Sequence, residues 1–193
     1  MNSPPGLSKY FIALIPPPSV YDLAMQWKEF FKTNFNSKAA LNSPPHITLH
    51  MPFERKTSKE EMLKTAFQKF SSEQQPFHVQ VKNFGCFPPR VIFLQVVENA
   101  SLHAMQKRLV SFCKLELNLF NANRLDKPFN PHLTVAFRDL KKNDFPKAWE
   151  LIQTHSFEEN FFASQLSLLK RTGHFWTVLE NFDFQEPYQP EGN

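Results

Sequence analysis

The chain contains little glycine, little cysteine and no long apolar run. Only 4 of its 193 residues are glycine, and it has neither a G-x-x-x-x-G-K-[ST] nor a G-x-G-x-x-G motif, so side chains would have to hold any bound phosphate. Cys86 and Cys113 match no C-x-x-C pattern, which favours free thiols in a reducing cytoplasm. No apolar run approaches the roughly 20 residues that span a bilayer, and the N-terminus shows no signal peptide. We therefore expect a cytoplasmic protein that makes no membrane contact.

The charge of the chain is mildly positive and evenly spread. Lysine and arginine together number 22, against 18 aspartate and glutamate residues, so the net charge is +4 at pH 7 when histidine is counted as neutral. The sequence contains no block of consecutive basic residues. This balance favours anionic ligands in general and argues against a basic tail that binds nucleic acid. With 41% apolar residues, the chain suits one domain with a full core, and we expect a monomer.

Two segments, 86 positions apart, carry nearly the same sequence. Residues 45–49 read Pro-His-Ile-Thr-Leu, and residues 131–135 read Pro-His-Leu-Thr-Val. Successive side chains of a strand point to opposite faces, so His46 shares a face with Thr48, and His132 shares one with Thr134. A fold that places these strands side by side would gather two imidazoles and two hydroxyls around one point.

Such a cluster suits acid–base chemistry on a phosphate ester. Attack at phosphorus requires a base, an acid for the leaving oxygen and donors for the phosphate oxygens. Two imidazoles with pKa values near ~6.5 supply base and acid, and threonine hydroxyls can donate to the phosphate. This scheme requires neither a metal ion nor a cofactor. A single histidine or threonine on a strand is usually structural, so the prediction depends on the two copies occurring together.

The predicted elements repeat in the same order around the two motifs. Each half reads strand, helix, His-x-Thr strand, helix, strand, which predicts two lobes related by a pseudo-twofold axis, with the histidine strands facing across a groove. We expect one two-lobed domain over residues 1–184 and a flexible, polar tail over 185–193. Strands are predicted over 9–15, 46–52, 77–81, 90–97, the second His-x-Thr segment 132–135, 162–169 and 175–184, and a turn is predicted over 85–89. Helices are predicted over 19–34, 58–70, 101–117 and 144–154, the second opened by a capping box of Ser58 and Glu61.

Together these residues resemble the two-histidine phosphoesterases, a family that includes 2′-5′ RNA ligase-like proteins and RNA 2′,3′-cyclic phosphodiesterases. The resemblance implies an α+β, bilobal LigT-like fold, with a duplicated βαβαβ arrangement and mainly antiparallel sheets around a central cleft. It rests on residues 46–49 (HITL) and 132–135 (HLTV), supported by residues 10–14, 87–91, 127–131 and 166–170.

The resemblance also implies an activity, the metal-independent hydrolysis of a 2′,3′-cyclic phosphate to a 2′-phosphate. In that scheme His132 activates water, His46 protonates the departing 3′ oxygen, and Thr48 and Thr134 hold the phosphate. The two histidine roles are interchangeable at this stage because the halves are alike. The implied partner is a nucleotide or an RNA terminus with a 2′,3′-cyclic phosphate, and ligation is the related transfer to a 5′-hydroxyl.

One position departs from the family pattern. Many cyclic phosphodiesterases of this family carry an arginine five residues after the second histidine, where this chain has Phe137 and places Arg138 one residue further. An extra residue on a strand reverses the face of its side chain, so Arg138 should miss the usual place unless the strand bulges.

Five further residues are weaker candidates for substrate binding. Tyr10 and Phe87, like Trp176, have rings that could stack on a base, although core packing is the ordinary role of aromatic residues. Arg90 and Lys170 could contact phosphate oxygens or be solvated. His50 shares the face of His46 by alternation and could line the cleft or lie at its edge.

Two other functions remain open from the sequence. The same chemistry could act on a linear 2′-5′-linked oligonucleotide, or the cleft could bind a nucleotide or RNA without significant turnover. Both His-x-Thr pairs are intact, which argues against a mere binding module.

Overall fold

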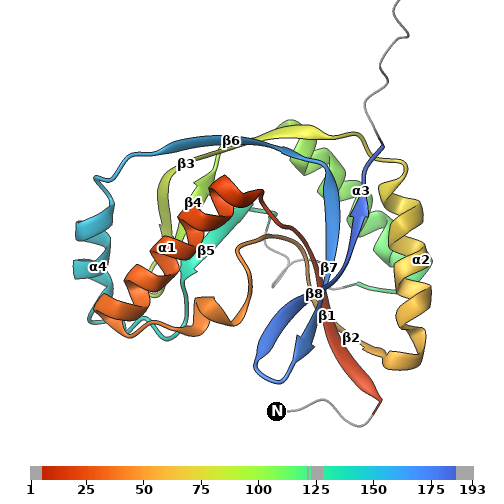
Figure 1. The fold of residues 1–193 in the computed structure, drawn as a ribbon, viewed down its shortest axis with the longest axis horizontal. Helices are drawn as coiled ribbons and strands as arrows, with labels where there is room; N and C mark the ends of the chain where they lie inside the picture. The colour runs from red at the N-terminus through yellow and green to blue at the C-terminus, as the bar shows by residue number, and fades with distance from the viewer. Residues whose placement is uncertain (1–5, 121, 123–127, 186–193) are drawn as a thin grey trace, which may run out of the picture.

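The computed structural model describes residues 6–120, 122 and 128–185, and its described strands form a single curved sheet (Figure 1). The strand order is β6-β3-β4-β5-β2-β1-β7-β8, and every neighbouring pair is antiparallel. The strands are β1 (Leu7–Leu14), β2 (Ile47–Lys56), β3 (Phe77–Phe87), β4 (Val91–Val96), β5 (His132–Ala136), β6 (Glu158–Ala163), β7 (Gln165–Thr172) and β8 (Phe175–Asp183).

In the described part of the chain, four α-helices and two short 3₁₀ helices lie between these strands. Together with the sheet they bury one large apolar cluster, to which α4 contributes Phe145, Ala148 and Ile152. None of the described helices is long and apolar enough to span a membrane. The helical elements are α1 (Pro18–Phe35), η1 (Ala39–Asn42), η2 (Thr57–Lys59), α2 (Glu60–Ser71), α3 (Ala100–Leu117) and α4 (Phe145–Ile152).

The predicted repeat is visible in the two longest helices. Both α1 and α3 have 18 residues, and each ends at an asparagine in the left-handed conformation, Asn36 with φ of 53° and Asn118 with φ of 51°. Asparagine tolerates this conformation better than most residues, so it stops both helices at the same length. Each helix precedes a His-x-Thr strand in the chain, α1 before β2 and α3 before β5.

The sheet has two halves, but they are not the first and second halves of the chain. One half contains β2, β1, β7 and β8 and the other contains β5, β4, β3 and β6, with Ile47 opposite Leu133 joining them. The connecting helices cross over, since α1 packs against β5 whereas α3 packs against β2. The two histidine strands are therefore direct neighbours, instead of facing each other across a groove as the repeat had suggested.

Several predicted boundaries differ from the observed ones. Residues Thr57–Lys59 form η2, and α2 begins at Glu60 without a side-chain cap, so the predicted capping box of Ser58 and Glu61 is absent. Strand β3 continues to Phe87, and the turn occupies 88–90 in place of 85–89. The predicted strand over 162–169 is divided at Ser164 between β6 and β7.

The C-terminal boundary is described as far as Gln185. Its backbone N–H donates to the carbonyl oxygen of Gln74 at 2.8 Å, which ties the end of β8 to the segment after α2. The remainder of the predicted tail, residues 186–193, lies outside the described part of the chain.

Candidate active site

The pairing of β2 with β5 brings the two His-x-Thr motifs onto one surface. Ile47 lies opposite Leu133 in an antiparallel pair, so Thr48 lies opposite His132 and His46 lies opposite Thr134. Side chains directly opposite one another share a face, with Cβ atoms about 4.5–5.5 Å apart. The arrangement therefore alternates the two residue types around a compact square.

Both histidine rings are held in the same tautomer by the backbone. The Nδ1–H of His46 donates to the carbonyl oxygen of Pro44, and the Nδ1–H of His132 donates to that of Asn130, each at 2.7 Å. A carbonyl oxygen can only accept, so Nδ1 must carry the proton and Nε2 of the neutral ring is left with a lone pair. Each imidazole can thus accept a proton at Nε2, or donate it from there once protonated.

Aromatic rings pack on the two histidines in a matching way. Phe11 of β1 lies 4.8 Å from the ring of His46, and Phe93 of β4 lies 4.8 Å from the ring of His132, both measured between centroids. Phe87 meets His132 edge to face at 5.2 Å, which places this predicted residue beside the site. These contacts restrict both rings and keep water from their sides.

The surroundings of the two histidines favour their neutral forms. Burial, with smaller contributions from the positive charges of Lys28 and His132, lowers the pKa of His46 to about 4, against the raising effect of the bond to Pro44. Burial also lowers the pKa of His132. A bound phosphate would oppose these effects, because its negative charge stabilises an imidazolium.

The hydroxyl groups of Thr48 and Thr134 are available to a ligand. Both side chains are partly exposed on the site face, and within the described residues neither hydroxyl has a hydrogen-bond partner. Two donors on opposite sides of the histidine pair can hold two oxygens of one phosphate.

His50 does not join the site, contrary to the expectation from alternation. The register of β1 with β2 shifts between Thr48 and His50, since Ala13 pairs with Thr48 but Ile12 pairs with His50. This irregularity turns His50 toward the core, where it is 1% exposed and its Nδ1 bonds the carbonyl oxygen of Met51 at 2.8 Å. A β-bulge changes the face of every residue that follows it, which simple alternation cannot foresee.

Tyr10 and Lys170 also lie away from the two histidines. Tyr10 is fully buried in the main core, whereas its neighbour Phe11 faces the site. The Tyr10 hydroxyl donates to Glu60 Oε2 at 2.8 Å, and Lys170 Nζ donates to the same oxygen at 2.6 Å. The three side chains thus tie α2 to the sheet, so we assign Tyr10 and Lys170 a structural contact in place of the predicted substrate contact.

Arg90 and Arg138 are in contact beside β4 and β5, where Arg90 precedes β4 and Arg138 follows β5. Arg90 Nη1 donates to the carbonyl oxygen of Arg138 at 2.8 Å. Arg138 follows β5 with a φ of 34°, and its guanidinium lies 5.2 Å from the ring centre of Phe137. A left-handed turn therefore follows the strand at the position where the family pattern and this chain differ by one residue.

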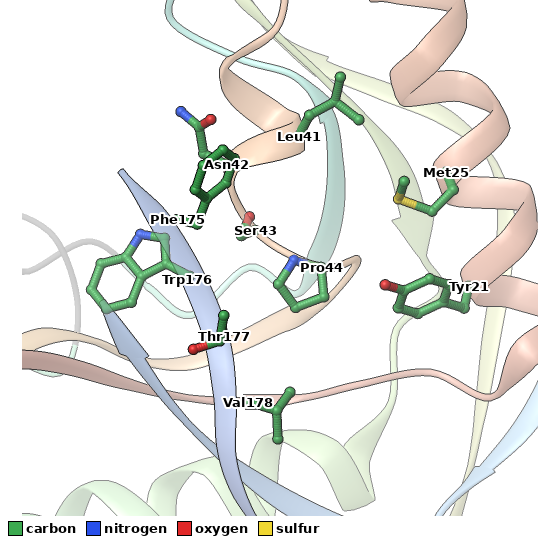
Figure 2. Close-up of a pocket in the computed structure, with 10 residues that line it drawn as sticks. All are labelled: Tyr21, Met25, Leu41, Asn42, Ser43, Pro44, Phe175, Trp176, Thr177 and Val178. Atoms are coloured by element: carbon green, nitrogen blue, oxygen red, sulfur yellow. The ribbon is translucent and has the colours of Figure 1, made fainter. Parts of the chain in front are cut away.

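Figure 2 shows an open groove between the 42–44 segment, α1 and β8, with a volume of about 450 Å³. Phe175 and Trp176 of β8 form one wall, and Trp176 packs edge to face on Phe11 at 4.8 Å, next to His46. Pro44, whose carbonyl holds His46, also lines the groove. The other lining residues are Tyr21, Met25, Leu41, Asn42, Ser43, Thr177 and Val178.

Sequence reasoning did not single out Phe11, Phe93 or Lys28. Each phenylalanine lies on the strand that opens its repeat, Phe11 on β1 and Phe93 on β4. A comparison of the two repeats could therefore have found them. Lys28 lies four residues after Ala24 and three before Phe31 on the apolar face of α1, an unusual position for lysine. In the described residues, no group of three or more His, Cys, Asp or Glu side chains is placed to hold a metal ion.

Comparison with known proteins finds a matching family model and relatives that share most of the chain. A model of the 2′-5′ RNA ligase superfamily matches residues 16–175. A protein of Geobacillus kaustophilus (strain HTA426) is 29% identical and one of Geobacillus sp. (strain WCH70) is 30% identical, each over 178 residues that cover 90% of this chain and 95% of the relative. The names of both relatives assign them provisionally as phosphoesterases.

Solved structures share the fold across nearly the whole chain. TT0787 of Thermus thermophilus matches with a TM-score of 0.69 and 20% identity, covering 93% of this chain and 100% of that one. Escherichia coli LigT, solved with 3′-AMP, matches with a TM-score of 0.67 and 19% identity, covering 92% of this chain and 98% of that one. The bilobal LigT-like fold predicted from the sequence is thereby confirmed.

Proposed function

Because the chain belongs to the 2′-5′ RNA ligase superfamily, we propose that it is a phosphodiesterase that hydrolyses 2′,3′-cyclic phosphates, on RNA ends or small nucleotides, to 2′-phosphates. One observation carries the proposal, the antiparallel pair that sets His46 and Thr48 against Thr134 and His132 on a single face. The backbone leaves Nε2 of both rings free to exchange protons. Such a pair supplies base and acid together.

The proposed reaction moves one proton at each end of the phosphorus displacement. One neutral histidine takes a proton from water through Nε2 as the water oxygen bonds to phosphorus. The bond from phosphorus to the 3′ oxygen breaks, and the other histidine, as imidazolium, gives its Nε2 proton to that oxygen. Thr48 and Thr134 donate hydrogen bonds to the non-bridging oxygens, which become more negative in the transition state. The residues themselves provide every proton transfer, so we expect turnover in the presence of EDTA.

The groove and the solved structures that share the fold favour a nucleotide substrate. Escherichia coli LigT has been solved with 3′-AMP, ATP and NADP+, so this fold accommodates nucleotides in that protein. The groove beside His46 has aromatic walls in Phe175 and Trp176 and polar groups in Asn42 and Thr177. Rings and polar edges of this kind suit a nucleobase. With a 5′-hydroxyl in place of water, the same site would perform 2′-5′ ligation.

A linear 2′-5′-linked oligonucleotide is the second candidate substrate. The specific observation in its favour is that the groove is open, which leaves room for a nucleoside on the His46 side of the scissile phosphate (Figure 2). Its cleavage would use the same two histidines.

The test compares turnover of 2′,3′-cyclic AMP and of a short RNA ending in a 2′,3′-cyclic phosphate, with EDTA present. We expect a 2′-phosphate product, and His46→Ala and His132→Ala should each reduce kcat by about 10³-fold or more. His78→Ala is the control, because His78 lies on β3 against Phe162 of β6, a strand at the far edge of the sheet.

Two results would replace this proposal. Cleavage of a 2′-5′-linked dinucleotide, with no turnover of either cyclic substrate by folded protein, would establish the linear substrate. Nucleotide binding without any turnover, unchanged in both histidine variants, would indicate a binding module.

A further inference from the structure

Lys28 places a positive charge inside the apolar face of α1. Its side chain is 1% exposed, and the residues that share its face are Val20, Ala24, Phe31 and Phe35. Lysine is rarely buried without an acidic partner, because transfer of an ammonium out of water is unfavourable. The position therefore calls for an explanation beyond packing.

The buried ammonium has a backbone partner and no ion pair. Nζ donates to the carbonyl oxygen of Ser43 at 2.9 Å, and within the described residues no carboxylate lies within ion-pair distance of it. Asp139, whose carboxylate faces the end of α1, is bonded to Ser37 Oγ and to the backbone N–H groups of Lys38 and Ala39. Burial lowers the pKa of Lys28 to about 7.

The bond from Lys28 reaches the segment that holds His46. Ser43 accepts from Lys28, and the next carbonyl along the chain, that of Pro44, accepts the Nδ1–H of His46. Figure 2 shows Ser43 and Pro44 together on the segment that leads from η1 to β2. Lys28 thus bonds, from inside the protein, the residue next to the one whose carbonyl accepts from His46.

The charge of Lys28 also acts on His46 itself. Lys28 and His132 are the charged groups that lower the pKa of His46, and no carboxylate contributes. Since Lys28 is protonated below pH about 7, its charge is present throughout the range in which His46 would take up a proton. Its presence makes protonation of His46 less favourable.

The second half of the repeat lacks this feature. Lys28 lies eight residues before Asn36, which caps α1. The residue eight positions before Asn118, which caps α3, is Val110. Burial and the Asn130 bond are the causes that act on the pKa of His132, with no lysine among them. Lys28 therefore breaks the near-symmetry of the two histidines.

We propose that Lys28 is a positioning residue for His46: its buried ammonium bonds the carbonyl oxygen of Ser43 and so fixes the segment whose next carbonyl, that of Pro44, holds the Nδ1–H of His46. The catalytic part of His46 rests on the proposed function, whereas its positioning by Lys28 does not. The inference follows from a side chain whose matching position in α3 is Val110.

The first test measures the ring without any turnover. Long-range ¹H–¹⁵N NMR of histidine-labelled protein reports the tautomer and the pKa of His46 and His132 in the wild type and in Lys28→Met, which keeps the length of the side chain. We expect the pKa of His46 to rise by about one unit in the variant, with a smaller change at His132. Lys32→Met, an exposed position one turn further along α1, should move neither value.

A further variant separates the hydrogen bond from the charge. Lys28→Gln retains an N–H donor for Ser43 and removes the charge, so we expect it to keep the His46 tautomer while raising the pKa as Lys28→Met does. If the tautomer and pKa of His46 are the same in wild type and Lys28→Met, the proposal is wrong, whether or not the protein turns over cyclic phosphates.

Kinetics then test whether the ring that Lys28 positions takes part in the reaction. In Lys28→Met, one limb of the pH profile of kcat/KM should move upward by the same amount as the NMR pKa of His46. An unchanged profile beside a shifted NMR pKa would show that Lys28 does not position a catalytic ring. Absence of turnover in the wild type would contradict the proposed function and leave the NMR result to decide the role of Lys28.

Discussion

At the scale of single residues, the site is built from two equal motifs placed in unequal surroundings. Both imidazoles bond a carbonyl two residues upstream at 2.7 Å and pack against a phenylalanine at 4.8 Å. The environment differs in the buried ammonium of Lys28, which bonds the segment just before His46. Equal geometry suits both rings to proton transfer, while their surroundings differ in charge.

The threonine hydroxyls should contribute to the transition state and little to folding. Thr48→Val and Thr134→Val keep the β-branched shape and remove the hydroxyl, so we expect kcat/KM to fall by about 10- to 100-fold in each. The free energy of unfolding should change by less than about 1 kcal/mol in urea titrations, because both side chains are partly exposed.

Thr172→Val, an exposed change on β7, serves as the strand control and should leave both quantities unchanged. Wild-type kcat/KM in Thr48→Val and Thr134→Val would show that the hydroxyls do not hold the phosphate.

At the scale of elements, the hairpin of β3 and β4 supports His132 through a glycine. Gly85 pairs with Phe93, and a Cβ at Gly85 would fall well inside contact distance of the Phe93 ring. Phe93 in turn packs on His132. The absence of a side chain at Gly85 therefore determines where the His132 ring can lie.

Gly85→Ala should consequently impair activity by displacing that ring. We expect kcat/KM to fall by about 10- to 100-fold, with a loss of about 1–3 kcal/mol of stability. In the double variant Gly85→Ala, Phe93→Leu the clash is relieved, so stability should recover while activity stays low, because the ring contact with His132 is missing. Full activity in Gly85→Ala would show that the Phe93 contact is dispensable.

The groove offers a second prediction at this scale, because its wall on β8 is exposed. Phe175 is 57% exposed, so Phe175→Ala should leave the melting temperature nearly unchanged and raise KM for 2′,3′-cyclic AMP by about 3- to 10-fold, the loss of one stacking contact. Phe162→Ala removes an equally exposed ring, 58%, from β6 at the opposite edge of the sheet. Equal KM values in the two variants would exclude the groove as a base site.

At the scale of the whole molecule, the crossing of α1 and α3 joins the halves more firmly than the sheet does. Ile47 and Leu133 form the pairing between β2 and β5, but α1 follows β1 and packs on β5, and α3 follows β4 and packs on β2. Neither half of the sheet can keep its helix cover if the other unfolds. We therefore expect the two lobes to fold as one domain.

This expectation predicts a single unfolding transition. Trp27 packs on Phe84 of β3, whereas Trp176 packs on Phe11 of β1, so fluorescence can follow the two halves separately. Trp176→Phe leaves tryptophan signals at α1 and α4, and the double change Trp27→Phe, Trp149→Phe leaves only Trp176. In each protein the urea midpoint from fluorescence should coincide with that from circular dichroism. Two separate midpoints would show that the lobes are independent.

The order of elements and the pairing of functional residues were accessible from the sequence. Alternation along a strand is a local property of the backbone, so the amino-acid pattern alone places His46 with Thr48, and His132 with Thr134, on common faces. The repeated motif and the apolar spacing of the helices are equally local. These features agree with the fold that the motifs implied.

The misplaced candidates depended on contacts between distant segments. The irregular register near Leu49 turns His50 into the core, and the direction of β1 carries Tyr10 away from the site while Phe11 faces it. Alternation defines two faces without saying which one a helix will cover, and a bulge depends on the partner strand.

The burial of Lys28 has the same origin. The sequence shows a lysine on the apolar face of α1, but its neighbours, Ser43 and His46, lie 15 and 18 positions away and come together only when α1 crosses onto the other half of the sheet. The local pattern of residues therefore specifies strands, helices and shared faces, whereas packing between remote segments sets burial, and burial sets the charge state of each histidine.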